Sequence, residues 1–310
     1  MRPGGGGRVV YGLIAALGWG LSAVAATNAA RRAGTYLAVL SGQGLGVIVL
    51  LLLAALFRPS FAAADGTVAL SLAGAGLLGL VGYLAFYRAL EYGGAVGMVS
   101  AISATYGGVT TVLAVAVLGE HLAVLGALGV ALAVAGIALA AARQATGAGA
   151  ALAVGEPMVG VAPAPSRIRG LSRAGVPLAI ASALAYGVGG FLLGKYSARA
   201  GWLVAALVAH GASVTVLLTA LPVLGRRKAW RGSASGVIWA AAAGLTDVVG
   251  LLAFSRGGQI GQVAVTAAVS SVYPVIPVAA GMLLFGEQLT RRQLAGVAGI
   301  IAGLVLIGLS

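Results

Sequence analysis

The feature that most limits the fold is an internal repeat within a very apolar chain. The segment Gly119-Glu120-His121-Leu122 recurs 167 positions later as Gly286-Glu287-Gln288-Leu289. At the same offset, the further matching pairs are Ser103 and Ser270, Tyr106 and Tyr273, and Trp19-Gly20 and Tyr186-Gly187. Repeats of this kind are typical of membrane proteins that are built from two related halves.

The composition and the long apolar runs indicate helices that cross a membrane. Sixty per cent of the 310 residues are hydrophobic and only 8% are charged, whereas a soluble domain has about 25% charged residues. Continuous apolar runs of ~20 residues suit transmembrane helices, whereas a membrane β-barrel needs ~10-residue segments of alternating polarity. We therefore expect an all-α polytopic membrane protein with ten transmembrane helices, near residues 9–29, 35–57, 67–88, 94–118, 122–142, 176–194, 201–224, 235–254, 260–285 and 292–309.

The composition also excludes several classes of partner and chemistry. The net charge of +13 comes from basic residues scattered at the ends of the apolar runs, where they orient helices and meet lipid headgroups. We therefore expect no nucleic-acid binding. The chain has no cysteine, no Gly-x-x-x-x-Gly-Lys-Ser/Thr motif and no histidine–glutamate metal spacing. We expect no cofactor, no metal and no enzymatic activity.

The chain divides into two halves and a connector. The first half covers residues 1–142, the second covers 176–310, and residues 143–175 form a loose linker interrupted by proline and glycine. Each half contains five expected helices. Because five is odd, the second half enters the membrane from the opposite side, and a pseudo-two-fold axis in the membrane plane relates the halves. In such inverted repeats the substrate site lies near the midplane.

Several motifs together resemble the EamA family of the drug/metabolite transporter superfamily. They are an aromatic–glycine pair in the first helix, a serine and a tyrosine in the fourth, and a Gly-Glu-x-Leu turn before the fifth. The family pattern also has a proline after the fourth-helix tyrosine. This chain has Pro274 in the second half but Gly107 in the first. The resemblance implies ten helices, a central cavity and alternating-access movement of small metabolites.

The fourth helix of each half contains residues that interrupt a helix. Pro274 and Pro277 lack the N–H that would bond four residues back, and Gly107 and Gly108 occupy the matching region of the first half. We expect these four residues to act as hinges. The polar residues at the same places are candidates to face a substrate pathway: Ser103, Tyr106, Ser270 and Tyr273. The alternative is that both breaks only shape helix packing.

Aromatic and amide side chains in the middle of the spans are further candidates for the substrate pathway. Trp19 and Tyr186 are aligned by the repeat and lie away from the membrane interfaces, where aromatic residues usually gather. Together with Tyr83 they offer either a flat wall with a polar group or simple core packing. Gln43 adds an amide to an otherwise apolar run.

Asp247 is the only acidic residue well inside an expected span. Insertion of a carboxylate at the bilayer centre costs ~2.5–3.5 kcal/mol, so Asp247 should face a cavity or a partner. Proton coupling or recognition of a substrate amine is one interpretation, and a local bond is the other. His210 is a candidate partner for Asp247 or a packing residue. The repeat places Leu80 and Gln43 at the matching positions of the first half.

Glu120 and Glu287 occupy matching positions of the repeat, and two carboxyl groups can act together in acid–base chemistry. In an inverted repeat, however, they lie at opposite sides of the membrane and share no acid–base chemistry. We expect each to cap the helix that follows it, because acidic charge is favoured at a helix amino end.

These observations lead to two related functional hypotheses. The first is a secondary transporter that exports small polar or amphipathic metabolites, amino-acid-like ones included, by alternating access. The second is proton-coupled efflux of drugs or other cations. A non-transporting scaffold is less consistent with a carboxyl group and a proline break at mid-membrane. Expected partners are a small-molecule substrate, protons as coupling ions and the lipid bilayer, in the prokaryotic plasma (inner) membrane.

The distribution of basic residues gives an orientation that differs from the one the resemblance implies. On the side of the two termini lie 6 of the 19 Lys and Arg residues, and 13 lie on the other side. The positive-inside rule therefore places the termini outside the cell. The resemblance implies termini in the cytoplasm.

Overall fold

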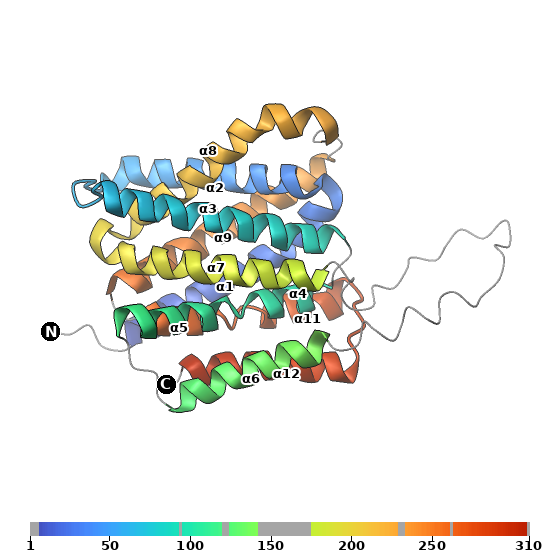
Figure 1. Cartoon of the computed structure of the whole chain (residues 1–310). Coiled ribbons are helices and arrows are strands. Elements are labelled where there is room, and N and C mark those ends of the chain that lie inside the picture. The colour runs from blue at the N-terminus through green and yellow to red at the C-terminus, as the bar shows by residue number, and fades with distance from the viewer. Residues whose placement is uncertain are drawn as a thin grey trace, which may run out of the picture.

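The apolar runs fold as α-helices that lie side by side along one direction (Figure 1). The computed structural model describes residues 6–92, 95–119, 124–141, 175–228, 233–260 and 263–308, and within these ranges it contains helices and no strands. The expected linker, 143–175, lies outside the described residues except for Gly175. The first half contains α1 (Gly6–Ala33), α2 (Thr35–Phe57), α3 (Gly66–Glu91), α4 (Val96–Ser103), α5 (Tyr106–Leu118) and α6 (Val124–Ala141). The second half contains α7 (Gly175–Ala200), α8 (Trp202–Lys228), α9 (Ala234–Ile260), α10 (Val263–Ser270), α11 (Val275–Leu284) and α12 (Arg291–Gly308).

Within the described residues, eight segments are long and apolar enough to cross a membrane. Two of these spans are each made of two helices, α4 with α5 and α10 with α11. The last helix of each half, α6 or α12, has 18 residues, and these two helices pack against each other at one side of the bundle (Figure 1). The all-α membrane fold is therefore confirmed. A membrane crossing by α6 and α12, and with it the count of ten, stays a prediction.

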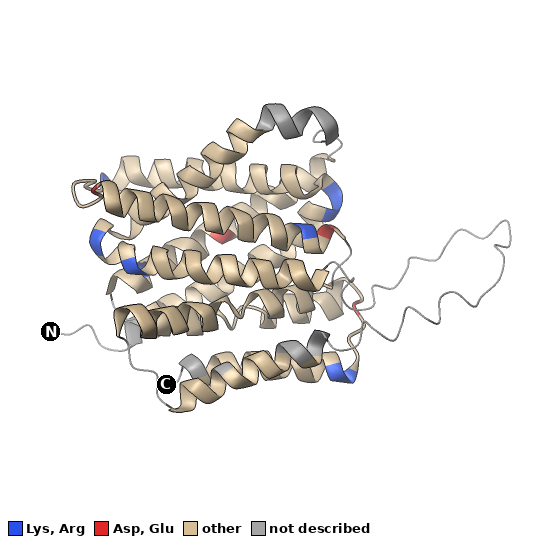
Figure 2. Cartoon of the chain, viewed as in Figure 1, with Lys and Arg blue, Asp and Glu red and all other residues tan. Residues whose placement is uncertain are grey.

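Several helices extend beyond the ends expected from hydropathy. Helix α1 continues to Ala33 instead of residue 29, and α7 continues to Ala200 instead of residue 194. The added turns carry basic residues, Arg31 and Arg32 in α1 and Arg199 in α7. Long basic side chains reach water or headgroups while the backbone stays helical, so hydropathy marks the oily layer rather than the helix end. Figure 2 shows these charges gathered at both ends of the bundle.

The distribution of side chains is typical of a membrane protein whose outer surface contacts lipid. Large apolar residues such as Leu52, Leu70 and Leu283 are exposed on the outer surface. Polar residues such as Gln43 and Asp247 are buried inside. Lipid tails accept exposed apolar side chains, whereas polar groups need partners within the protein. The interior of this bundle is therefore the place where polar chemistry is possible.

The first helices of the two halves run in opposite directions. Arg199, near the end of α7, pairs with Asp65, which caps the start of α3, at 3.3 Å between Nη2 and Oδ2. Helix α7 is therefore antiparallel to α3. Helix α1 runs in the same direction as α3, because α2 returns between them (Figure 1). Helix α7 consequently runs opposite to α1, which is the relation that an inverted repeat requires.

Helices of the two halves also pack against each other reciprocally. Helix α1 packs along α9 and α3 packs along α7, so the first helix of each half lies against the third helix of the other. Matching close contacts accompany this exchange. Gly20 lies against the carbonyl of Tyr273, and Gly187, its repeat counterpart, lies against the carbonyl of Tyr106. The interior between the halves is therefore built from matching surfaces related by a two-fold axis.

Both interrupted spans break at matching positions. The first breaks at residues 104–105, between α4 and α5, and the second breaks at residues 271–274, between α10 and α11. The breaks lie against each other, because a Cβ added to Gly107 would overlap the Ser271 hydroxyl. The first half thus breaks without a proline, and Thr105 Oγ1 donates to the carbonyl of Ile102 at 2.7 Å. A proline is therefore not necessary for this interruption.

The backbone conformation explains why each Gly-Glu turn of the repeat contains a glycine. Gly119 and Gly286 both adopt the left-handed conformation, with φ of 68° and 62°. A side chain at such a position costs roughly 1–2 kcal/mol, and glycine avoids that cost. The same turn therefore requires the same residue at the end of the interrupted span in both halves.

Glu287 caps a different helix from the one expected. Its carboxyl oxygens accept hydrogen bonds from the backbone N–H groups of Val96 and Gly97, at 2.6 and 3.3 Å, at the amino end of α4. Arg31 lies 4.0 Å away. The expectation that Glu287 caps α12 is wrong, because the halves meet here and α4 lies nearer than the chain's own next helix. Glu120 lies outside the described residues.

Candidate substrate-binding site

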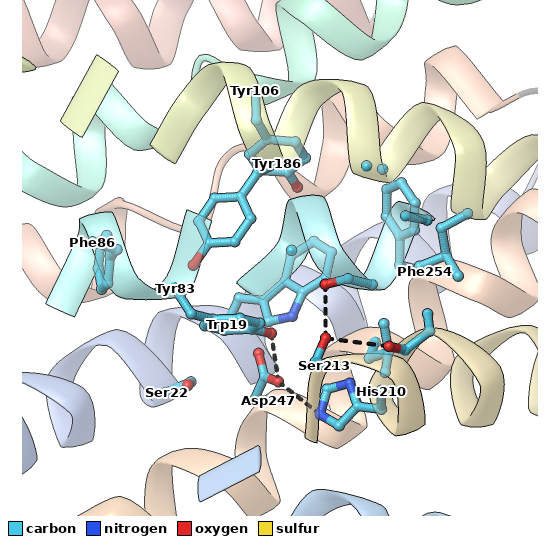
Figure 3. A pocket seen from close by; sticks show the side chains of 18 of the residues that line it. Trp19, Ser22, Tyr83, Phe86, Tyr106, Tyr186, His210, Ser213, Asp247 and Phe254 are labelled. Carbon is cyan, nitrogen blue, oxygen red and sulfur yellow. Dashed lines mark hydrogen bonds and ion pairs between the residues drawn. The ribbon is translucent and has the colours of Figure 1, made fainter. Parts of the chain in front are cut away.

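A cavity of about 130 Å³ lies between the two halves, in the middle of the bundle. We call it the central cavity. It is lined by side chains of α1, α3, α5, α7, α8 and α9 (Figure 3), and by Tyr273 from the break before α11. One water needs only ~10–15 Å³ of such space, so this cavity has room for more than a single water.

The walls of the central cavity are largely aromatic. Eight aromatic residues line it: Trp19, Tyr83, Phe86, Tyr87, Tyr106, Tyr186, Phe254 and Tyr273. The Trp19 ring lies 5.8 Å from that of Tyr106 and 5.4 Å from that of Phe254, and the Tyr83 and Tyr186 rings are 5.4 Å apart and nearly perpendicular. Edge-to-face pairs of this kind hold one another's orientation. The cavity therefore has flat, ordered walls that suit an apolar or cationic molecule.

Among the residues that the structure describes, a single carboxyl group faces this aromatic cavity. Asp247 lies halfway along α9, at the acidic position in the middle of the bundle (Figure 2). The Tyr83 hydroxyl donates to Asp247 Oδ2 at 2.7 Å, and His210 Nε2 lies 3.8 Å from the same oxygen (Figure 3). No Lys or Arg is among the described residues that line the cavity. The ionisable groups of the described lining are thus one acid, one imidazole and several phenols.

The polar cluster around Asp247 comes from four helices, two in each half. Gln43 lies on α2, Tyr83 on α3, His210 on α8 and Asp247 on α9. Gln43 and His210 are repeat counterparts, and they approach Asp247 from different sides. Leu80, the counterpart of Asp247, is a buried apolar residue. The fold is therefore nearly symmetric around the cavity, whereas its charge lies on one side.

The residues beside the breaks divide between the cavity and the packing behind it. Tyr106 and Tyr273 line the central cavity, whereas Ser103 and Ser270 are fully buried outside its lining. Ser270 hydrogen-bonds the Tyr106 hydroxyl at 2.6 Å, and Ser103 bonds Ser182 at 2.6 Å. The Tyr273 hydroxyl donates to the carbonyl of Ser100 at 3.0 Å. The serines therefore hold the tyrosines and helices in position.

The expected hinge residues lie at the starts of the second helical segments. Pro274 immediately precedes α11 and Pro277 is in its first turn, where a missing N–H costs little. Gly107 and Gly108 occupy the first turn of α5. All four residues adjoin the breaks, and none of them lines the central cavity.

Several residues of the cavity were not expected from the sequence. They are Ser22, Phe86, Tyr87, Ser213 and Phe254. Tyr87 and Phe254 are repeat counterparts, so a search for paired aromatic residues would have found them. The hydroxyls of Ser22 and Ser213 donate to carbonyls of neighbouring helices, Ala243 and Gly76. No sequence signal distinguishes such serines from other small residues.

The described residues contain no group of three His, Cys, Asp or Glu side chains placed to hold a metal ion. The groups that line the central cavity can recognise a molecule by charge, by hydrogen bonds and by aromatic faces.

Comparisons with known proteins show which protein family the chain matches. The model of the EamA-like transporter family matches residues 8–142 and, separately, residues 173–309. No curated protein sequence matches the chain. One solved structure, described only as a crystal structure of a protein, matches with a TM-score of 0.67, covering 97% of this chain and 97% of its own. The two sequences are 16% identical, so this likeness shows a shared fold alone.

Proposed function

The chain belongs to the EamA-like transporter family of the drug/metabolite transporter superfamily, and from that premise we propose that it is a secondary transporter of small amphipathic organic cations. The transported molecule carries a protonated amine or another cationic group beside an apolar body. The cation binds at Asp247, and the apolar body lies against the aromatic walls of the central cavity.

The observation that carries this proposal is a single carboxyl group in an aromatic cavity whose described lining contains no Lys or Arg. A cation over an aromatic face gains ~0.5–2 kcal/mol, and more when water is excluded. Asp247 adds an opposite charge that the described lining leaves without a Lys or Arg partner. A carboxyl group at this depth costs several kcal/mol to insert, which favours a role in binding or coupling.

Amino-acid-like metabolites, the other hypothesis, fit this cavity less well. A zwitterion brings a carboxylate that needs a cationic partner among the largely apolar and aromatic walls of the cavity. His210 is the only group of the described lining that can supply such a charge, and it already lies beside Asp247. A cation requires no second charged partner.

The inverted halves supply a means of moving the bound molecule. In inverted-repeat transporters, one bundle rocks against the other around a site near the midplane. The two breaks, at residues 104–105 and 271–274, lie next to Tyr106 and Tyr273, so bending there changes the walls of the cavity directly. Asp247 binds either a proton or the cation, which links transport to a pH gradient.

The test uses purified protein in lipid vesicles and three probes with one phenyl group each. The probes are trimethyl(2-phenylethyl)ammonium as the cation, phenylalanine as the zwitterion and 3-phenylpropionate as the anion. We expect saturable, pH-gradient-driven accumulation of the cation alone. The Asp247→Asn variant should lose this accumulation by at least about tenfold, because a neutral amide gives up the charge pair.

Asp65→Asn is the matched control, since Asp65 is an exposed acid whose cap to α3 an asparagine preserves. This variant should transport as the unmodified protein does. Accumulation of phenylalanine in place of the cation would support the metabolite hypothesis. Failure of all three probes with folded protein would overturn the proposal.

A further inference from the structure

A second, much smaller cavity lies behind Asp247. We call it the rear chamber. It measures about 10 Å³ and lies between α2, α3 and α9, where Gln43, Tyr83, Tyr87 and Asp247 contribute polar groups to its walls. Tyr83, Tyr87 and Asp247 also line the central cavity. These three side chains therefore form a wall with the central cavity on one side and the rear chamber on the other.

Gln43 contributes an unsatisfied acceptor to the rear chamber. The residue is 4% exposed, and its Oε1 has no hydrogen-bond partner among the described residues. Its amide interacts with the Tyr83 hydroxyl, which in turn donates to Asp247. A buried amide oxygen without a partner costs ~1–3 kcal/mol, and such groups in proteins are usually satisfied by the chain or by an ordered water.

The rear chamber meets the two conditions for an ordered water. A bound water needs ~10–15 Å³ and 2–4 polar partners. The volume corresponds to one molecule, and the amide oxygen, two phenols and the carboxyl group supply enough partners. The remaining walls come from Val39 and from three small residues, Gly42, Ala243 and Gly244, which leave this space between the helix backbones.

We propose that the rear chamber binds one water molecule, which donates one hydrogen bond to Gln43 Oε1 and the other to the Asp247 carboxylate. Gln43 is then a positioning residue for the cation-binding carboxyl group, and it acts through this water and through Tyr83. The inference rests on the proposed function in one respect: the ionised form of Asp247 is taken to be the one that binds a cation.

The bound water stabilises the Asp247 carboxylate from the rear chamber. The side of the carboxylate that faces the central cavity stays open to the substrate. The titratable groups that face Asp247 are Tyr83 and Tyr87 from α3, Tyr186 from α7 and His210 from α8. Trp19 on α1 and Gln43 on α2 add groups that do not titrate in this range. The hydrogen bond of the water favours ionisation of Asp247 by a route that does not occupy the central cavity.

The test is the pH profile of binding of trimethyl(2-phenylethyl)ammonium to purified protein, measured by the change in intrinsic tryptophan fluorescence, to which Trp19 in the cavity contributes. In Gln43→Leu, we expect the midpoint at which binding appears to move to higher pH by about 0.5–1 unit. Affinity at the highest pH should recover to that of the unmodified protein. A merely structural role for Gln43 would lower affinity equally at every pH.

A second variant separates the water from the amide. Ala243→Val fills the rear chamber but leaves Gln43 and Tyr83 in place, so it should shift the midpoint in the same direction. Density for a water between Gln43 and Asp247 in a high-resolution structure of the unmodified protein provides a measurement that depends on no variant.

The outcomes distinguish this inference from the proposed function. If the unmodified protein binds the cation but no density fills the rear chamber and Gln43→Leu keeps the same midpoint, the water proposal is wrong and the transport proposal stands. If the unmodified protein binds no cation at any pH, the proposed function is wrong, and the density alone decides whether the water is present.

Discussion

At the scale of single residues, the main property of the molecule is that one carboxyl group carries the charge of the central cavity. Asp247 is held by the Tyr83 hydroxyl at 2.7 Å, with His210 at 3.8 Å. Its counterpart, Leu80, shows that the fold itself does not need an acid at this place. Asp247 therefore breaks the symmetry of the two related halves. The residues that contact it are the first ones to change.

Removing the Tyr83 hydroxyl should change the pH at which Asp247 becomes ionised. Tyr83→Phe keeps the ring but loses the hydrogen bond to the carboxylate, and a bond to a charged group contributes about 1.5–3 kcal/mol. Because the charged form loses support, the pH at which a cation begins to bind should rise by about 1–2 units. Cation binding measured from pH 5 to 9 checks this. Tyr92→Phe, at an exposed tyrosine outside the cavity, should leave the profile unchanged.

Two glycines that are two residues apart on α2, and therefore on different faces of the helix, provide a second test at this scale. A Cβ added to Gly46 would lie 2.9 Å from His210 Nε2 and 2.9 Å from Val248, whereas Gly44 has nothing within 4 Å. Gly46→Ala should push the imidazole away from Asp247, with a cost of about 1–3 kcal/mol in stability and weaker cation binding. Gly44→Ala should be neutral or slightly stabilising. Thermal unfolding in detergent and binding assays together check both variants.

At the scale of helices, the interrupted spans are held from the opposite half. Glu287 follows α11, yet its carboxyl group satisfies the first N–H groups of α4. Burial raises the pKa of Glu287 above its ordinary value, and the N–H groups of Val96 and Gly97, together with Arg31, offset part of this increase. The contact closes one end of the bundle where α4 and α11 meet.

Loss of this cap should lower stability. Glu287→Ala should cost about 1–2 kcal/mol, the usual contribution of a helix cap. The exposed neighbour Gln288 is the control, and Gln288→Ala should have no effect. Thermal unfolding of the purified protein measures both. An unchanged melting temperature for Glu287→Ala would contradict the role as a cap.

The raised pKa of Glu287 also predicts a pH dependence of stability. The folded protein binds this proton more tightly than the unfolded chain, so the contribution of Glu287 is present at low pH and is lost as pH rises through the raised value. The melting temperature of the unmodified protein should therefore fall more steeply above pH ~4.5 than that of Glu287→Gln, whose amide does not titrate. Equal slopes in the two proteins would argue against a buried, titrating carboxyl group.

Sequence patterns predicted which helices form, but they did not always predict which side chains of a helix line the cavity. The lone acid and the lone histidine of the spans identified Asp247 and His210, because ionisable residues are rare in an apolar run. Ser103 and Ser270 lie behind the cavity instead of in its lining, although Tyr106 and Tyr273, three residues further along the chain, line it. The cap from Glu287 to α4 joins residues 191 positions apart, and local rules address only neighbouring residues.

At the scale of the whole molecule, the inverted arrangement makes a prediction about the two sides of the membrane. The turn between α2 and α3 contains the exposed Ser60, and Ser233, also exposed, precedes α9 at the other end of the bundle. The chain has no native cysteine. Single variants Ser60→Cys and Ser233→Cys should therefore react with an impermeant thiol reagent from opposite sides.

The same labelling decides the orientation. Arg31, Arg32, Arg88, Arg291 and Arg292 lie at the end of the bundle that contains Ser233, and Arg58, Lys195, Arg199 and Arg256 lie at the other (Figure 2). The positive-inside rule predicts that Ser60→Cys reacts in intact cells and Ser233→Cys only after lysis. The reverse result would place the termini in the cytoplasm. Reaction of both from one side would contradict the inverted fold.

The reciprocal packing of α1 with α9 has a consequence for synthesis on the ribosome. The hydroxyl of Ser22 donates to the carbonyl of Ala243, 221 residues further along the chain. At ~5–20 residues per second, α1 waits on the order of 10–40 s in the bilayer before its main neighbour is translated. During this interval Ser22 lacks its partner on α9, so a chain that terminates after the first half should be a substrate for membrane quality-control proteases.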